Sequence, residues 1–222
     1  MDKDIEQSQH IIKDLKEFLK AQREAGEEWL GLPKQILSST ILSVLRDSVK
    51  DCTRCMLSSS RTQVVFGEGD PSARLFLIGE APGAEEDRTG RPFIGRAGEL
   101  LAKIIEAIRL SREQVYISSV IKCRPPGNRT PEQNEINTCK PFLFQQIQAI
   151  RPSIICTLGS VATNTILGIN EPISKSRGKF HDFHGIYVMP TFHPAYLLRN
   201  QKDKKLVWED MQKIQALYQK LL

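Results

Sequence analysis

Short apolar segments alternate with helical ones from Arg74 onward, and this alternation constrains the fold more than any other feature of the 222-residue chain. Strands are predicted over residues 74–80, 115–123, 153–159 and 186–192. Helices are predicted over residues 98–110, from Thr130 onward, over 160–167 and over 204–222. Such alternation is typical of a mostly parallel sheet covered on both faces. We therefore expect an α/β fold, a three-layer α/β/α sandwich around a central four-stranded, mostly parallel sheet.

Two boundaries within this pattern depend on proline. Thr130 and Pro131 suit the N-cap and first position of a helix, with Gln133 completing a capping box. Pro141 lies eleven residues after Thr130 and is expected to end or kink that helix, because proline lacks the backbone N–H of a helix interior.

Helical patterns also precede the alternating region. Apolar residues recur at helical spacing between Ile11 and Leu19, and a second helix is predicted over residues 35–49, after the break at residues 31–33. We interpret residues 1–48 as an N-terminal helical extension that packs on a main domain of residues 49–222. Binding to a partner and loose attachment remain alternatives for this extension.

The composition is that of an ordinary soluble protein, with 40% hydrophobic and 26% charged residues. No apolar run is long enough to span a membrane, and the N-terminus lacks the apolar core of a signal peptide. We expect a cytoplasmic monomer without membrane association. The formal net charge of +5 fits a polyanionic partner such as DNA, although many basic proteins bind no nucleic acid.

Four of the five cysteines flank the segment 79-GEAPGAEEDRTGRPFIGRAGELL-101. Cys52 and Cys55 form a C-x-x-C pair before it, and Cys123 and Cys139 follow it. Disulfides are disfavoured in the cytosol, so the four thiolates are candidate ligands of an iron–sulfur cluster or a structural zinc. The spacing does not distinguish these metals. Cys156 lies inside an apolar strand, where burial as a small hydrophobic residue is expected.

Several polar and glycine positions should meet at one edge of the sheet, because ligands of such sheets bind beyond the carboxyl ends of the strands. These positions are the loop 79-GEAPG-83, Ser119, residues 159–160 and His193. Glycines in the loop let backbone amides approach a ligand, and Glu80 could orient or deprotonate a water. A tight structural turn is the alternative. The lysine and the serine or threonine of a Walker phosphate loop are missing.

Phe93, within 92-PFIG-95, could stack on a nucleic-acid base, or it could be a core residue. His193 could donate a hydrogen bond to a developing anion, or it could be structural. Tyr196, Leu197 and the following leucine form an apolar tip that could wedge into a base stack while Arg199 meets phosphate. A helix start that buries its leucines is the alternative to the wedge.

Three segments together resemble the family 4 uracil-DNA glycosylases, the iron–sulfur type of the uracil-DNA glycosylase superfamily: 79-GEAPGAEEDRTGRPFIGRAGELL-101, 122-KCRPPGNRTPEQNE-135 and 193-HPAYLLR-199. The cysteines fall in the family's order, and the resemblance extends from about residue 49 to the C-terminus. It implies a three-layer α/β fold and a [4Fe–4S] cluster that orders DNA-facing loops. The implied cluster ligands are Cys52, Cys55, Cys123 and Cys139.

The resemblance also implies a function. The protein would be a monofunctional DNA glycosylase that flips uracil out of single- or double-stranded DNA and hydrolyses its N-glycosidic bond, leaving an abasic site for base excision repair. The backbone of Gly79, Glu80 and Ala81 would line the uracil pocket, Phe93 would stack on the base, and His193 would lie over uracil O2. Other superfamily members carry a water-positioning aspartate at the place of Ala81, so Glu80 is the expected substitute. Acids of the following loop, Glu86 and Asp87, are possible helpers or simply solvated.

One position departs from the family. Members commonly carry asparagine four residues before the third cysteine, where it reads the uracil edge, and this chain has Ser119 there. A hydroxyl cannot reproduce the paired contacts of an amide. An alternative function is therefore a catalytically weak or altered-specificity DNA-binding protein of the same fold. After 92-PFIG-95 the chain lacks the inserted basic loop of the covalent branch, so covalent trapping of DNA is not expected.

Overall fold

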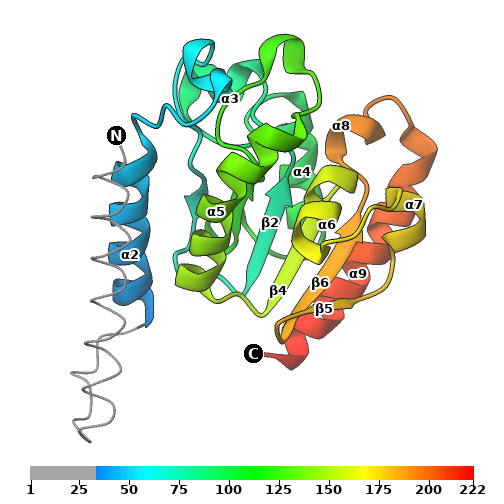
Figure 1. The fold of residues 1–222 in the computed structure, drawn as a ribbon. Coiled ribbons are helices and arrows are strands. Elements are labelled where there is room, and N and C mark those ends of the chain that lie inside the picture. The colour runs from blue at the N-terminus through cyan, green and yellow to red at the C-terminus, as the bar shows by residue number, and fades with distance from the viewer. Residues whose placement is uncertain (1–33) are drawn as a thin grey trace, which may run out of the picture.

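The computed structural model describes residues 34–222 (Figure 1). The helix predicted between Ile11 and Leu19 lies outside the described residues. Six strands form one sheet in the order β1-β3-β2-β4-β6-β5. Their bounds are β1 Glu68–Gly69, β2 Leu75–Gly79, β3 Tyr116–Ser119, β4 Ile154–Leu158, β5 His181–Phe183 and β6 Ile186–Thr191.

Helices surround this sheet in the described residues. The α-helices are α2 Lys34–Val49, α3 Ala84–Thr89, α4 Arg96–Ala107, α5 Gln133–Ile150, α6 Ser160–Leu167, α7 Ile173–Ser176, α8 Pro194–Leu197 and α9 Lys204–Lys220. Short 3-10 turns cover Met56–Ser59, Arg112–Gln114, Pro126–Asn128 and Gln201–Asp203.

The predicted four-stranded parallel sheet is confirmed as the centre of the fold. Strands β3, β2, β4 and β6 pair in parallel, and β1 and β5 add antiparallel edges to β3 and β6. The prediction missed the two edge strands, which have only two and three residues and carry no buried apolar pattern. Gly79 pairs with Ser119 and Leu158 pairs with Thr191, so the parallel strands end at one edge of the sheet.

Each face of the sheet carries its own hydrophobic core. Phe76 and Ile78 of β2 pack with residues of α2, α5 and α6, whereas Leu75 and Leu77 pack with residues of α4 and α9. All five residues of β2 are buried, as expected for a parallel strand covered on both sides. The three-layer α/β/α prediction is therefore confirmed.

Helix α5 differs from its prediction at its start, and of the two alternatives for Pro141 it excludes a helix end. It begins at Gln133 with Glu132 as N-cap, because the Glu135 carboxylate accepts the Glu132 N–H at 2.7 Å, so Thr130 and Pro131 lie before the helix. It does not end at Pro141 but continues to Ile150. Pro141 is solvent-exposed, and the turns beyond it bury apolar side chains, which offsets the cost of about 3 kcal/mol for a proline inside a helix.

Helix α2 is the described part of the predicted N-terminal extension, and it lies alongside α5 (Figure 1). Ser38 Oγ donates to the Ala149 carbonyl at 2.8 Å, and Leu42, Leu45 and Val49 join the hydrophobic core. Residues 34–49 are therefore packed on the domain rather than loosely attached. None of the helices within residues 34–222 is both long and apolar enough to cross a membrane.

Candidate active site

Gly79 and Ser119 form the floor of the candidate site at the carboxyl edge of the sheet. Helices α3 and α8, which follow β2 and β6 in the chain, both lie at this edge, at the top of Figure 1. A Cβ added to Gly79 would lie 2.4 Å from Phe93 Cζ and 3.4 Å from Ser119 Oγ. The structure therefore brings together three of the predicted substrate-binding residues. It also gives a physical reason for the glycine, because any side chain at position 79 would displace the Phe93 ring.

Phe93 is buried, with only 7% of its surface exposed, and has a backbone φ of 51°. A bulky residue rarely adopts this left-handed conformation unless its surroundings hold it there. A Cβ at Gly98 of α4 would lie 1.9 Å from the Phe93 carbonyl oxygen, so this glycine lets the first turn of α4 pack directly against the loop.

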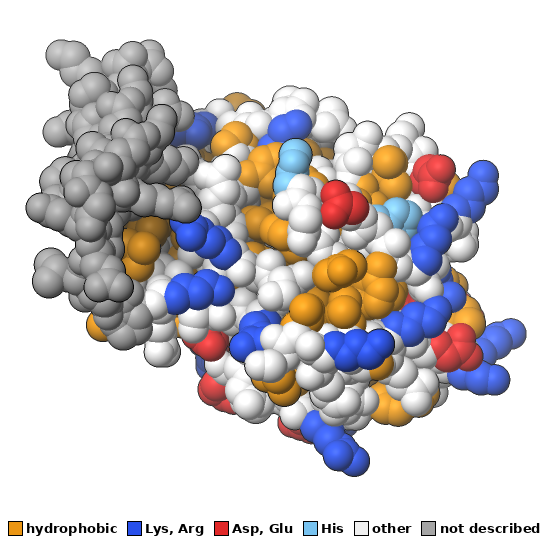
Figure 2. All heavy atoms as spheres, turned by 90° about the horizontal axis from the view of Figure 1, so that it is seen from below, with side chains coloured by type: hydrophobic (Ala, Val, Ile, Leu, Met, Phe, Trp, Pro, Cys, Tyr) orange, Lys and Arg blue, Asp and Glu red, His pale blue; other side chains and the backbone are white. Residues whose placement is uncertain are grey.

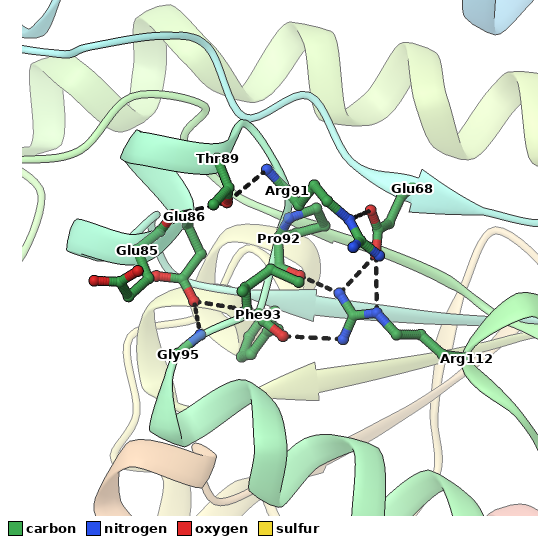
Figure 3. Close-up of polar contacts among 10 residues, drawn as sticks. Glu68, Glu85, Glu86, Thr89, Arg91, Pro92, Phe93, Gly95 and Arg112 are labelled. Atoms are coloured by element: carbon green, nitrogen blue, oxygen red, sulfur yellow. Dashed lines mark hydrogen bonds and ion pairs between the residues drawn. The ribbon is translucent and has the colours of Figure 1, made fainter.

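Glu86 of α3 connects the loop of residues 79–83 to the loop of residues 92–95, and Figure 3 shows its contact with Gly95. Its Oε2 accepts the Gly83 N–H at 3.0 Å, and its Oε1 accepts the N–H groups of Ile94 and Gly95 at 2.8 and 2.9 Å. Asp87 is buried and accepts the Thr62 N–H at 2.9 and 3.1 Å. Neither acid is a solvated loop residue, which corrects that alternative. The sequence held one signal for Glu86, its capping-box spacing from Gly83.

His193 lies directly before α8 and faces Phe93, with the ring centroids 5.6 Å apart. Its Nδ1 accepts the Ala195 N–H at 3.1 Å. Burial lowers the pKa of His193 to about 4, although the nearby Glu86 carboxylate opposes this shift. The imidazole is therefore neutral at pH 7, and because Nδ1 is an acceptor, the proton lies on Nε2. His193 can present one N–H donor to a ligand.

Glu80 follows Gly79 directly and is half-buried. Burial raises the pKa of its carboxyl above the ordinary value. Its backbone carbonyl accepts the Ile121 N–H at 3.2 Å, which fixes the start of the loop beside the end of β3. The next residue, Ala81, is half-buried and packs against the core on the α5 side of the sheet.

The predicted DNA-facing tip of residues 196–199 is only partly as expected. Leu197 is fully buried and packs in the core with α4 and α9, so its prediction as an exposed wedge is wrong. The alternative of a helix start that buries a leucine is what the structure shows. Tyr196 stacks on Phe192 at 4.9 Å and donates its hydroxyl to Asp203 Oδ2 at 2.7 Å. Arg199 is exposed.

Cys52, Cys55, Cys123 and Cys139 line one cavity between the end of α2, the loop after β3 and helix α5. Within residues 34–222, however, no three His, Cys, Asp or Glu side chains are grouped closely enough to hold one metal ion. Four cysteine thiolates are the donor set of an iron–sulfur cluster or of a structural zinc. Cys156 is buried elsewhere in the core, as expected.

The surroundings of this cavity are cationic. Arg61 Nη1 donates to Cys123 Sγ at 3.3 Å, and the guanidinium of Arg54, which also lines the cavity, lies over the Phe142 ring at 4.6 Å. Burial raises the pKa of Cys139 to about 12, so this thiol keeps its proton until a metal displaces it. Cationic side chains around four cysteines suit a group that carries net negative charge once its thiolates are bound.

Lys122 connects this cavity to the sheet edge. Its backbone N–H donates to Cys139 Sγ at 3.3 Å, and its fully buried Nζ donates to the Ser119 carbonyl at 2.8 Å. The other Nζ acceptors are Ser118 Oγ at 2.6 Å and Gln146 Oε1 at 2.7 Å, and burial lowers the pKa of the amine to about 7. Sequence reasoning missed this residue, because a lysine beside a cysteine gives no sign of being buried.

Charged side chains are spread over the end of the molecule opposite the candidate site. Figure 2 views the molecule from below, from the side opposite α3 and α8, and shows Lys and Arg side chains scattered among apolar and acidic ones. The net charge of +5 is therefore not gathered into one basic surface on this face.

Comparison with known proteins agrees with this geometry. The model of the uracil DNA glycosylase superfamily matches residues 66–213, which include all six strands. The type-4 uracil-DNA glycosylase of Thermotoga maritima is 45% identical over 184 residues, which cover 81% of this chain and 96% of that protein. The type-4 enzyme of Saccharolobus solfataricus is 45% identical over 182 residues, covering 78% of this chain and 84% of its own.

A type-5 relative matches less of the chain than the type-4 relatives do. The type-5 uracil-DNA glycosylase of Pyrobaculum aerophilum is 32% identical over 146 residues, 58% of this chain and 64% of that protein. The type-4 relatives thus match more of the chain at higher identity. On the family match and these identities, the chain belongs to the type-4 family of the uracil-DNA glycosylase superfamily.

Proposed function

We propose that this protein is a monofunctional DNA glycosylase that removes uracil from single- or double-stranded DNA and leaves an abasic site. One observation carries the proposal: Gly79, Phe93, Ser119 and His193 meet at one sheet edge in a chain 45% identical to type-4 uracil-DNA glycosylases. We expect it to act as a monomer in the cytoplasm.

Base release requires a pocket for an extruded base and a donor for the charge that the base acquires. The target base is out of reach inside a duplex, so it must leave the stack and enter the site. The Phe93 ring offers it a stacking surface beside the Gly79 backbone. As the glycosidic bond breaks, negative charge grows on uracil, and the Nε2–H of His193 can stabilise it at O2. One well-placed donor of this kind contributes about 2.7–4 kcal/mol.

Glu80 is the residue proposed to orient or deprotonate the attacking water through its ionised carboxylate. Both carboxylate oxygens of Glu86 already accept backbone N–H groups, and those of Asp87 accept the Thr62 N–H. Glu80 is half-buried, and its raised pKa means that it holds a proton to higher pH than an ordinary glutamate. It must be ionised to orient or deprotonate water, so activity should fall as pH falls through this raised pKa.

Ser119 is the proposed base-reading residue, although its hydroxyl makes fewer bonds than an asparagine amide. Its position beside Gly79 supports this role. Ser119→Asn should increase selectivity for uracil over other bases, and an unchanged substrate panel would show that position 119 does not face the base. Nothing in residues 34–222 favours the alternative of a non-catalytic DNA-binding protein.

Cys52, Cys55, Cys123 and Cys139 are the proposed ligands of a [4Fe–4S] cluster. Their shared cavity and its cationic surroundings support this assignment. When bound, the cluster supplies a covalent cross-link between the segment after α2, the loop after β3 and helix α5. Visible absorption with iron and sulfide analysis tests the assignment, and zinc in place of iron would refute it.

Labelled oligonucleotides carrying one uracil, single-stranded and paired with guanine or adenine, test the activity. Parallel substrates with hypoxanthine, xanthine and mismatched thymine define the lesion range. We expect uracil release followed by strand cleavage at the abasic site on alkaline treatment. A metal-loaded protein that releases uracil from none of these three uracil substrates would refute the proposal. Arg199→Gln should weaken binding to all sequences alike if that exposed side chain meets phosphate.

A further inference from the structure

The strained backbone of Phe93 needs groups that hold it. Its φ of 51° is one that bulky residues rarely adopt, and its ring lies against Gly79 and His193. Glu86 holds the loop from one side through the N–H groups of Ile94 and Gly95. These bonds fix the residues after Phe93 and leave its own carbonyl to another partner.

Arg112 holds the loop from the opposite side (Figure 3). Its Nη1 donates to the Phe93 carbonyl at 3.0 Å, and its Nη2 donates to the Pro92 carbonyl. Two adjacent carbonyls are thus bound by one planar guanidinium, which fixes the peptide between Pro92 and Phe93. A lysine ammonium could not bind both carbonyls with the same fixed geometry.

The Arg112 guanidinium is itself fixed by a carboxylate. Its Nε donates to Glu68 Oε1 at 2.8 Å, and Arg91 binds the same carboxylate at 2.8 and 3.1 Å. Burial opposes the ionisation of Glu68, but the hydrogen bonds from Arg91 and Arg112 hold its pKa below the ordinary value. The Arg112 side chain is 17% exposed and that of Arg91 is 59% exposed, and it is the more buried Arg112 that binds the loop carbonyls.

We propose that Arg112 is a positioning residue for base capture: it fixes the Pro92–Phe93 peptide, and through it the Phe93 ring that receives the flipped base. Arg112 does not itself contact the base. This inference rests on the proposed function, in which Phe93 stacks on uracil. The inference gives the 3-10 turn Arg112–Gln114, which follows α4 at the edge of the sheet, a role in the active site.

A double-mutant cycle separates positioning from general stabilisation. Arg112→Met and Phe93→Ala are made singly and together in metal-loaded protein, and uracil release is measured under single-turnover conditions with the inhibition constant of free uracil. Arg112→Met should slow release and weaken uracil inhibition by about tenfold to 10²-fold, the scale of a misplacement of roughly 1 Å. In the Phe93→Ala background the same change should have little further effect, because the ring it positions is gone.

Arg91→Met is the matched control. Arg91 binds the same Glu68 carboxylate, but the bonds to the loop carbonyls come from Arg112, so the Arg91 variant should release uracil at the parent rate. If Arg112→Met does not fold, Arg112→Lys takes its place in the cycle and should give a smaller loss of the same kind. Equal losses with and without Phe93, or equal effects at positions 91 and 112, would overturn the inference.

A spectroscopic measurement keeps this inference separate from the proposed function. 4-Fluorophenylalanine at position 93 reports the ring environment by ¹⁹F NMR without any substrate. Arg112→Met should shift or broaden this resonance, whereas Arg91→Met should leave it unchanged. A shifted resonance in a protein that releases no uracil would refute the proposed function and retain the positioning role. An unshifted resonance in an active protein would refute the positioning role alone.

Discussion

Replacing Gly79 with alanine tests the central contact of the site. The added Cβ would lie 2.4 Å from Phe93 Cζ and 2.7 Å from Phe93 Cε2, whereas ordinary contact begins at 3.4 Å. The ring must therefore withdraw by about 1 Å, because carbon atoms this close repel strongly. The Phe93 backbone cannot follow easily, since Glu86 and Arg112 hold the loop from both sides.

The expected cost follows from this displacement. Overpacking a well-packed site costs about 1–3 kcal/mol in stability. A misplacement of roughly 1 Å at a reacting centre lowers the rate by about 10²-fold. Gly79→Ala should therefore fold with slightly reduced stability but release uracil about 10²-fold more slowly than the parent. Single-turnover release from a uracil-containing duplex measures the rate, and urea unfolding measures the stability.

Gly95→Ala is the matched control in the same site. Gly95 has a φ of −68°, and an added Cβ there would meet its nearest atoms at 3.6–3.8 Å, which is ordinary contact. This variant should behave as the parent does. Adding Phe93→Ala to Gly79→Ala should remove the clash, so Gly79→Ala should cost no further activity in that background. Equal rates for Gly79→Ala and Gly95→Ala, or an undiminished cost without the Phe93 ring, would show that this steric reasoning is wrong.

Three further predictions concern groups that the structure buries or occupies. The pKa of His193 is about 4 in the folded protein, below its ordinary 6.5. The unfolded chain therefore takes up a proton at higher pH, and stability is lost as pH falls from about 6.5 to 4. His193→Asn should lack this part of the pH dependence of stability in urea unfolding. Asp210→Ala should destabilise the fold by about 3–5 kcal/mol, again measured by urea unfolding. The Asp210 carboxylate accepts hydrogen bonds from Arg177 at 2.5 and 3.1 Å, and its removal leaves a largely buried guanidinium without its carboxylate. Glu86→Gln should lower the stability by about 1–3 kcal/mol and slow uracil release, because the amide NH₂ of glutamine cannot accept a backbone N–H. Unchanged stability and rate would contradict the bridging role of Glu86.

The central fold could be predicted from the sequence because its signals are local. Strand β2 is a continuous apolar run that ends in Gly79, and β3 ends in Ser119, which lies beside Gly79 at the carboxyl edge. Strands β1 and β5 were not predictable in this way, since two or three half-exposed residues become strands only when a neighbouring strand pairs with them. Their existence depends on tertiary structure.

The site was predictable where residue type and local position carry a signal, and not where distant backbone decides. His193 was expected at the end of a strand and Phe93 in a glycine-flanked loop, and the structure places their rings together. The roles of Glu86 and Arg112 depend on backbone groups 8 and 19 residues away, which no local pattern reveals. Leu197 could have been a wedge or a core residue, and only the packing against α4 and α9 decides for the core.

The buried Lys122 connects the cysteine cavity to the base-reading end of strand β3. Its backbone N–H holds a cavity sulfur, and its side chain holds the carbonyl of Ser119, so one residue belongs to both places. Cys139 and the end of β3 are therefore connected through two hydrogen bonds of one residue. We expect the loss of this cavity sulfur to affect Ser119, the proposed base-reading residue, as well as the cavity itself.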